Sequence, residues 1–301
     1  MTIGLGIDGG GTATRWKLAD ADGQTIASGT AAPLSGHLFS TSAEERARQI
    51  IDDIAQTVSQ AGKPIGVVAG ITGLTREAPA ESAMRSMLAS ALGVSEQRVF
   101  VAEDMWIAYL AHFALGEGIL VYSGTGSIGY YLTEAKTVIR VGGLGNLIDD
   151  GGSGFWIARE ALKVVLRAEE EAPGSGWSTP LGEALAKAIG GTSWNNVRTF
   201  VYGGDRGRIG TLGRAVADAA VAGDVQALAI LEAAGRELAR LANSLIKQLG
   251  PRPVALMGGA SRMHPAILNS FRENLIPPSE VVVTEVDPAL TAARLAATLP
   301  G

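Results

Sequence analysis

The chain has 301 residues, a net charge of −5 at pH 7 and a hydrophobic content of 47%, so it is long enough for two domains with apolar cores. The acidic balance and the lack of a basic run argue against nucleic-acid binding, and the absence of cysteine excludes disulfides, iron–sulfur clusters and cysteine nucleophiles. We expect a cytoplasmic protein, because no signal peptide is visible and the apolar runs are too short to span a membrane.

The first part of the chain predicts two hairpins followed by alternating helices and strands. Apolar runs flank a glycine turn after residue 8, and Asp20-Ala-Asp-Gly23 is a second turn signal. A helix is predicted from Ser42, where Ser-x-x-Glu is a capping pattern. The later predicted elements are a strand at 65–71, a helix at 81–92, a strand at 98–102 and a helix at 105–115.

The second part repeats this order of elements around a large helical insertion. The predicted elements are strands at 119–122, 128–133 and 138–141, a mainly helical region at 155–249, a strand at 254–257, a helix at 265–274, a strand at 281–283 and a helix at 290–298. We therefore predict an α/β fold of two like domains, with strand-end loops lining a cleft between them. The expected domains are 1–115 and 116–301, with the final helix at 288–298 packing back on the first domain.

Two glycine turns in matching positions are the main candidates for phosphate binding. Asp8 precedes Gly9-Gly10-Gly11-Thr12, whose bare amides would admit a polyanion while the carboxylate holds a divalent cation. A plain glycine hairpin is the alternative. The second turn, Ser123-Gly-Thr-Gly-Ser127, again joins two strands through small residues, so the pair could hold a triphosphate from two sides.

A dinucleotide-binding fold is not supported, although the spacing G-x-G-x-x-G occurs twice. The matching residues are Gly4, Gly6 and Gly9, and Gly124, Gly126 and Gly129. That fingerprint must follow a strand and open a helix, whereas these glycines lie within strands or in hairpin turns.

Three further segments combine polar residues with strand ends or glycines. Asp104 lies between a predicted strand and helix, where it could be a helix N-cap or could accept a proton from an attacking hydroxyl. In the loop from Gly142 to Trp156, Asp149, Asp150 or Ser153 could cap the next helix, or Asp150 could bind a polyhydroxylated ligand. Gly258-Gly259 ends a strand and offers a flat surface to a ring, because no Cβ intervenes.

Together these motifs resemble the N-acetylglucosamine kinases, in the BadF/BadG/BcrA/BcrD-type branch of the actin-like sugar kinase superfamily. The resemblance covers nearly the whole chain and is most specific from Val121 to Lys163. It implies two ribonuclease H-like (actin-like ATPase) domains that close over ATP, Mg²⁺ and a sugar. The implied activity is transfer of the γ-phosphate to a hydroxyl, usually O6 of an amino sugar, by an enzyme that is often a homodimer.

The resemblance also implies roles for individual residues. Asp104 would be the general base, and Asp8 would orient Mg²⁺. The nucleotide would be bound by Gly10, Gly11, Thr12, Thr125, Gly258 and Gly259. The sugar would be bound, besides Asp104, by Ser35, Gly36, His37, Ser127, Gly143, Asn146 and Asp150.

The acceptor is left open by departures from the family pattern. Ser35, Gly36 and His37 stand where the family often carries an asparagine, and the family segment Gly-Asp-Glu-Gly-Ser reads Asp149-Asp-Gly-Gly-Ser153 here. N-acetylglucosamine, glucosamine, N-acetylmuramic acid or another hexose would fit. A sensor that binds ATP and sugar without turnover is the non-enzymatic alternative. The absence of cysteine excludes the related activators that need an iron–sulfur cluster.

Overall fold

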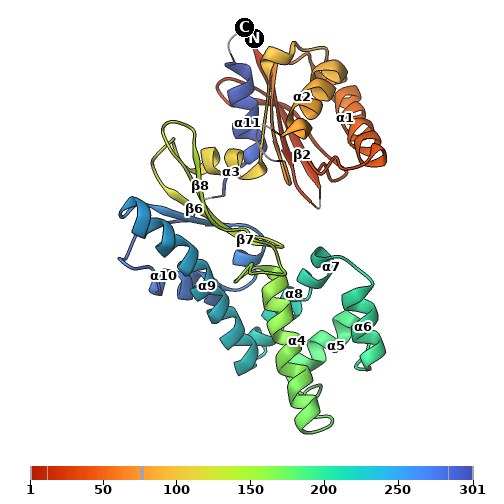
Figure 1. Cartoon of the computed structure of the whole chain (residues 1–301), viewed down its shortest axis with the longest axis vertical. Helices are drawn as coiled ribbons and strands as arrows, with labels where there is room; N and C mark the ends of the chain where they lie inside the picture. The colour runs from red at the N-terminus through yellow and green to blue at the C-terminus, as the bar shows by residue number, and fades with distance from the viewer. Residues whose placement is uncertain (1, 12, 75–77, 284, 300–301) are drawn as a thin grey trace. The chain divides into compact units, whose positions relative to one another are not determined.

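The computed structural model describes residues 2–11, 13–74, 78–283 and 285–299. The chain divides into two compact units, which are described one at a time. Unit 1 comprises Met1–Ala114 and Glu285–Gly301, and unit 2 comprises Leu115–Thr284. Figure 1 gives the element labels.

Unit 1 is built on a mixed five-stranded sheet in the order β3-β2-β1-β4-β5. The strands are β1 (Ile3–Gly9), β2 (Thr14–Asp20), β3 (Thr25–Ala31), β4 (Gly66–Ile71) and β5 (Val99–Ala102). Strands β1, β2 and β3 pair antiparallel, whereas β4 pairs parallel with β1 and with β5. The two opening hairpins are therefore followed by parallel strands, whose carboxyl ends lie at one edge of the sheet.

Helices cover both faces of this sheet: α1 (Thr41–Ala61), α2 (Pro79–Leu92), α3 (Asp104–His112) and α11 (Pro288–Ala297), with a short 3-10 helix at Glu96–Arg98. Helices α1 and α2 share one apolar core with Leu5 and Ile7 of β1. A second core on the opposite face joins Val68 of β4 to Ile107 of α3 and Ala292 of α11. Helix α1 begins one residue earlier than predicted, because Ser40 is its N-cap and accepts the Ala43 amide.

Helix α11 packs directly on the backbone of β1. A Cβ added at Gly4 would overlap the backbone of Ala293 and Ala297, and one added at Gly6 would overlap Ala289 and Ala293. The facing side of the helix is alanine-rich, with Ala292, Ala293 and Ala296 fully buried. Small residues on both elements therefore explain the glycines of β1, which sequence spacing alone matched to a nucleotide motif.

Unit 2 repeats the strand connectivity of unit 1. Its sheet has the order β10-β9-β6-β7-β8, formed by β6 (Ile119–Ser123), β7 (Ser127–Leu132), β8 (Val138–Gly142), β9 (Val254–Met257) and β10 (Val281–Val282). Strands β6, β7 and β8 pair antiparallel, and β9 pairs parallel with β6 and β10. The predicted fold class, two like α/β units, is confirmed.

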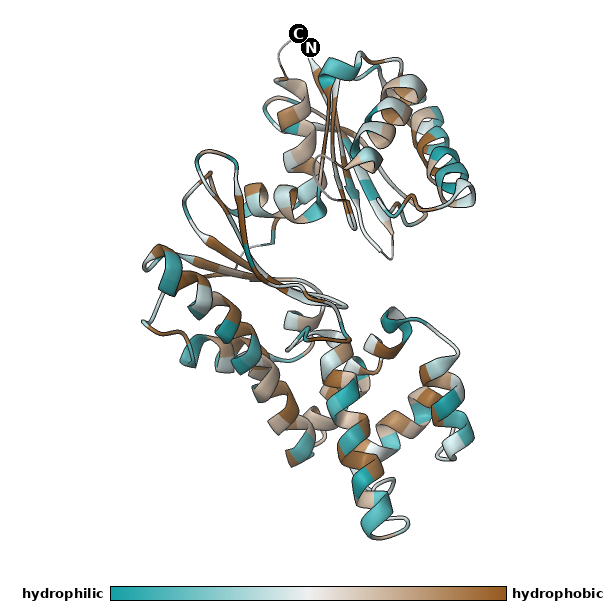
Figure 2. Ribbon diagram, in the orientation of Figure 1, coloured by the Kyte–Doolittle hydropathy of each residue, from teal (hydrophilic) through white to brown (hydrophobic). Residues whose placement is uncertain are grey.

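The helices of unit 2 are α4 (Gly154–Glu171), α5 (Pro180–Ile189), α6 (Trp194–Tyr202), α7 (Arg206–Gly210), α8 (Gly213–Val221), α9 (Val225–Leu249) and α10 (Pro265–Glu273), with a 3-10 helix at Ala260–Arg262. Helix α9 packs on β6, β7 and α10. Figure 2 shows hydrophobic strands and helices of mixed hydropathy, as expected for helices that cover a sheet. Every helix in the described ranges is too short or too polar to cross a lipid bilayer.

The contact between α11 and β1 leads to the first prediction. We expect Gly6→Ala to lower the free energy of unfolding by about 3 kcal/mol, because the new methyl group meets helix backbone that cannot rotate away. Gly11→Ala is the matched control, because its Cβ would meet nothing within 4 Å. Urea unfolding measures both. Equal stability of Gly6→Ala and wild type would contradict the packing of α11 on β1.

Candidate active site

The carboxyl ends of β1, β4 and β5 bring the two candidate carboxylates of unit 1 to one edge of its sheet. Asp8 lies opposite Gly70 in the parallel pair of β1 and β4, and Gly70 lies opposite Ala102 of β5. Asp104 follows two residues later as the first residue of α3. A Cβ at Gly70 would come within 3.2 Å of the Asp104 Cα, so the glycine makes room for the start of the helix.

Asp8 is a partly buried carboxylate beside other charged groups. Burial raises its pKa, the positive charge of Arg15 lowers it, and the negative charge of Asp287 raises it. Arg15 is the cross-strand partner of Asp8. Asp287 is the N-cap of α11 and forms an ion pair with Lys17 at 2.6 Å.

Asp104 has a pKa raised to about 6, above the range of an exposed aspartate. Burial is the largest cause, and the charges of Asp8 and Glu103 act in the same direction. Hydrogen bonds with the Met105 amide, at 2.9 Å, and with the Thr72 side chain oppose the shift. Asp104 can therefore change its proton occupancy near neutral pH.

The alternative role of Asp104 as a helix cap is met only in part. The N-cap position belongs to Glu103, whose side chain makes no capping hydrogen bond, while the Asp104 carboxylate accepts one amide in the first turn. The single hydrogen bond from the Met105 amide does not explain why the Asp104 carboxylate is buried close to the charge of Asp8. Asp104 therefore has more of the features of an acid–base group than a cap requires.

The loop with Ser35, Gly36 and His37 lies beside the same strand end. Ser35 forms a parallel bridge with Thr72, and the Gly36 amide donates to the Thr72 carbonyl at 2.9 Å. The His37 ring lies against Gly73, where it would overlap an added Cβ. The fold thus joins this loop to Asp104 through Thr72, a residue that sequence reasoning missed because it carries no motif.

The glycine turn after Asp8 is partly described. The Gly10 amide donates to the Ala13 carbonyl at 3.1 Å, which closes the turn, and Gly11 is exposed. Thr12, expected to bind phosphate, lies outside the described residues. The buried Thr14 hydroxyl donates to Ala32 at 2.8 Å and accepts the Leu34 amide at 2.9 Å. It thereby ties the turn to the loop that carries Ser35.

The second turn, in unit 2, is joined to the loop before α4. The Ser123 hydroxyl donates to the Gly152 carbonyl at 2.8 Å, and the Ser127 hydroxyl donates to the Gly151 carbonyl at 2.7 Å. Thr125 is partly exposed at the tip of the turn. Ser127, expected to bind the sugar, is buried, and its hydroxyl donates to the loop that carries Asp150.

Asp150 is the buried carboxylate of unit 2. Its side chain is 2% exposed, and its backbone has a φ of 59°, a left-handed conformation that costs a non-glycine residue about 1 kcal/mol. Oδ1 accepts the Ser127 amide at 3.4 Å, and Arg206 lies 3.8 Å from Oδ2. Burial raises the pKa of this carboxyl. Oδ2 has no hydrogen-bond donor among the described residues, so a ligand hydroxyl would complete the site.

Other predicted sugar and cap residues lie around Asp150. Gly143 has a φ of 66° and donates its amide to Ser127 at 2.9 Å, and Asn146 is in a partly buried turn. Ser153, one of three candidate caps, is the N-cap of α4 and accepts the Trp156 amide at 3.2 Å. Asp149 and Asp150 are therefore not needed to cap the helix.

At Gly11 and Gly259, neither the packing nor the backbone conformation requires a glycine. An added Cβ would meet nothing within 4 Å at either position, and neither has a left-handed φ. Gly258 differs, because its φ is 106° and a Cβ there would overlap the Ser123 backbone. A glycine that the fold itself does not require is expected where a ligand approaches the backbone closely, because a side chain there would block the ligand.

Mg²⁺ is compatible with the residues around Asp8. No group of three or more acidic, histidine or cysteine side chains in the described ranges could enclose a metal ion. However, Mg²⁺ commonly uses one or two carboxylates together with water and substrate phosphates. Burial is the largest cause of the raised pKa values of Asp8 and Asp104, and a nearby divalent cation would favour the ionised form of both carboxyls.

The raised pKa of Asp104 predicts an effect on stability. The pKa of Asp104 is about 6 in the folded protein and 3.8 for an ordinary aspartate. Ionisation of Asp104 therefore opposes folding, fully above pH 6 and not at all below about pH 4. We expect Asp104→Asn to raise the free energy of unfolding at pH 8 by up to about 3 kcal/mol, with the gain vanishing towards pH 4. Thermal unfolding with a metal chelator measures this. A variant destabilised equally at both pH values would show that Asp104 acts mainly as a cap.

The chain is similar in sequence to known proteins. The family model of the BadF/BadG/BcrA/BcrD ATPases matches residues 5–296. The N-acetylmuramic acid/N-acetylglucosamine kinase of Clostridium acetobutylicum is 30% identical over 79% of this chain and 77% of its own length. The N-acetyl-D-glucosamine kinase of Dictyostelium discoideum is 26% identical over 98% of this chain and 97% of its own.

A solved structure extends the likeness to the fold. A Chromobacterium violaceum protein described as a candidate N-acetylglucosamine kinase has a TM-score of 0.76 and 25% identity, and the match covers 99% of each chain. The resemblance read from the sequence motifs is thereby confirmed. Because the family model matches this chain over nearly the whole of the chain's length, the chain belongs to the BadF/BadG/BcrA/BcrD ATPase family.

Proposed function

We propose that this protein is an ATP-dependent sugar kinase that transfers the γ-phosphate to a hydroxyl of N-acetylglucosamine, with O6 as the acceptor atom. The observation that carries the proposal is the buried Asp104, with a pKa of about 6, beside Asp8 and the loop at Ser35–His37. The names of the two curated relatives support the sugar and the reaction type. The non-catalytic sensor is less favoured, because both curated relatives are named as kinases.

Asp104 is assigned the role of general base. Its ionised carboxylate would accept the proton of the sugar hydroxyl as the oxygen attacks the γ-phosphorus, and the Thr72 and Met105 contacts would hold it in place. Phosphoryl transfer depends mostly on positioning and on charge neutralisation. Loop 35–37, anchored to Thr72, would hold the sugar so that one hydroxyl faces Asp104.

Each unit carries candidate nucleotide contacts. The Gly11 amide and the Thr12 hydroxyl would donate to the terminal phosphates, and Gly10, whose amide closes the turn, would let them approach because it has no side chain. The Thr125 hydroxyl of unit 2 is a further candidate donor. Gly258 and Gly259 would border the adenine. Asp8 would hold Mg²⁺, which when bound neutralises charge on the phosphates.

Unit 2 also carries candidate contacts for the acceptor sugar. In unit 2, the unsatisfied Oδ2 of Asp150 would accept a sugar hydroxyl, with Gly143 and Asn146 alongside. Ser127 would contribute indirectly, since its hydroxyl holds the Gly151 carbonyl. N-acetylmuramic acid is the second candidate acceptor, because one curated relative is named for both sugars.

Sugar-dependent ADP release tests the function and the base together. We expect wild type to release ADP with N-acetylglucosamine, and Asp104→Asn to lose about 10²- to 10⁴-fold in kcat while still binding ATP. Wild-type kcat/KM should fall with acidity below about pH 6, where Asp104 takes up a proton.

Glu103→Gln is the matched control for this experiment. It should keep most of the activity and move the acid limb to lower pH, because the Glu103 charge raises the pKa of Asp104. No ADP release with N-acetylglucosamine, glucosamine, glucose or N-acetylmuramic acid would overturn the kinase assignment. Near-normal turnover by Asp104→Asn would remove only the assigned base.

The bare surface at Gly259 predicts a loss of nucleotide affinity without a loss of fold. Gly259 has a φ of −67°, which valine can adopt, and open space lies where its Cβ would go. We expect Gly259→Val to weaken ATP binding about tenfold or more in calorimetric titrations, with an unchanged melting temperature. Unchanged ATP affinity would place the adenine elsewhere.

A further inference from the structure

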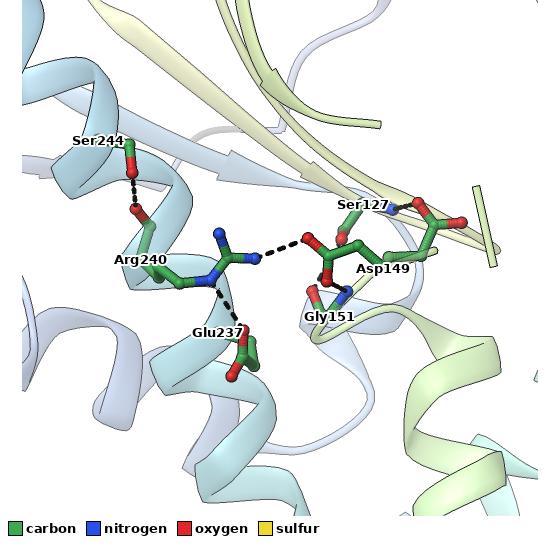
Figure 3. A network of polar contacts seen from close by, with 7 residues as sticks. Ser127, Asp149, Gly151, Glu237, Arg240 and Ser244 are labelled. Atoms are coloured by element: carbon green, nitrogen blue, oxygen red, sulfur yellow. Dashed lines mark hydrogen bonds and ion pairs between the residues drawn. The ribbon is translucent and has the colours of Figure 1, made fainter. Parts of the chain in front are cut away.

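The loop that carries Asp150 is tied to helix α9 by a charged network (Figure 3). Arg240 donates from Nη2 to Asp149 Oδ2 at 2.9 Å and from Nε to Glu237 Oε2 at 3.0 Å. Asp149 Oδ1 in turn accepts the Gly151 amide at 3.2 Å. The network therefore reaches the residues immediately before and after Asp150.

Glu237 also occupies the space that a side chain at position 151 would need. A Cβ added at Gly151 would come within 2.8 Å of Glu237 Oε2 and within 3.2 Å of its Cβ and Cγ. Gly151 has no left-handed φ. Its missing side chain is thus explained by the approach of α9, which supplies a carboxylate from a distant part of the chain.

The conformation of Asp150 depends on these flanking contacts. Asp150 has a φ of 59° and a buried carboxylate, an arrangement that neighbouring structure must enforce. Both contacts hold the next residue, Gly151. Its carbonyl accepts the Ser127 hydroxyl, and its amide donates to the Asp149 carboxylate. Arg240 fixes the Asp149 side chain that makes the second contact.

We propose that Arg240 and Glu237 are positioning residues of the acceptor site, which hold the Asp149–Gly151 turn so that the Asp150 carboxylate faces the sugar. The identity of the ligand rests on the proposed function, whereas the expected ordering of the loop is independent of it. Neither residue carries a recognised motif, and Arg240 lies 91 positions from Asp149.

The exposure of the network sets the size of the expected effect. The side chains of Arg240, Glu237 and Asp149 are 46%, 37% and 30% exposed. Ion pairs this accessible contribute little to global stability. The effect should therefore be local, with a melting temperature close to wild type and a change confined to the loop and to sugar affinity.

Arg240→Met tests the proposal, because methionine keeps an unbranched apolar side chain but removes the charge and the donors. Arg236→Met is the matched control, one turn earlier on α9 and with no part in this network. Hydrogen–deuterium exchange of the ligand-free protein, followed in peptides covering 144–156, should be about fivefold faster in Arg240→Met. The control should match wild type.

Kinetics give the second readout. We expect Arg240→Met to raise the KM for N-acetylglucosamine about fivefold and to leave the KM for ATP within twofold. Asp149→Asn should act similarly, and the double variant should be no worse than either single variant, because both remove one interaction. Additive effects would show that Arg240 does not act through Asp149.

Three results would contradict the positioning role of Arg240. Unchanged loop exchange in Arg240→Met would overturn the proposal, as would faster exchange with an unchanged sugar KM or an equal rise in both KM values. If wild type turned over no sugar, the proposed function would fail by itself. The exchange data would still decide whether Arg240 holds the loop.

Discussion

Helix α11 reaches the central strand of unit 1 only because Gly4 and Gly6 leave its face without side chains, and the site depends on this contact. The helix begins at Pro288, with its N-cap Asp287 electrostatically coupled to Asp8, the next residue of β1 on the same face. Gly70 of β4 makes similar room for α3 and thereby for Asp104. Close packing of two helices on glycine-bearing strands thus buries two carboxylates near each other, and burial is the largest cause of both raised pKa values.

The two units share strand connectivity but differ in chemistry. At the ends of β1 and β5, unit 1 has two carboxyl groups, Asp8 and Asp104, whose pKa values are raised mainly by burial. At the matching end of β6, unit 2 has hydroxyls and glycines that fasten a loop around Asp150. Unit 1 therefore carries the groups to which we assign proton transfer and cation binding. Unit 2 carries the loop to which we assign recognition of a polyhydroxylated ligand.

Much of the fold could be predicted because its signals are local. Apolar runs and turn residues gave the repeated order of strands and helices, and a carboxylate after a strand indicated Asp104. The contributions of Thr72, Glu237 and Arg240 could not be predicted, because each depends on contacts between segments distant in sequence. Gly4 and Gly6 show the same limit, since the sequence could exclude a dinucleotide motif but could not show that the last helix packs against them. The Ser127 hydroxyl is another case, because its partner lies in a loop 24 residues away.

The central claim is that this protein phosphorylates an amino sugar, and the direct measurement is the identity of the product. Wild-type protein would be incubated with ATP, Mg²⁺ and N-acetylglucosamine, and the mixture analysed by phosphorus–proton correlation NMR. We expect a new phosphate monoester coupled to the two C6 protons of the sugar, formed together with ADP. Inorganic phosphate as the only new phosphorus signal beside ADP would contradict it.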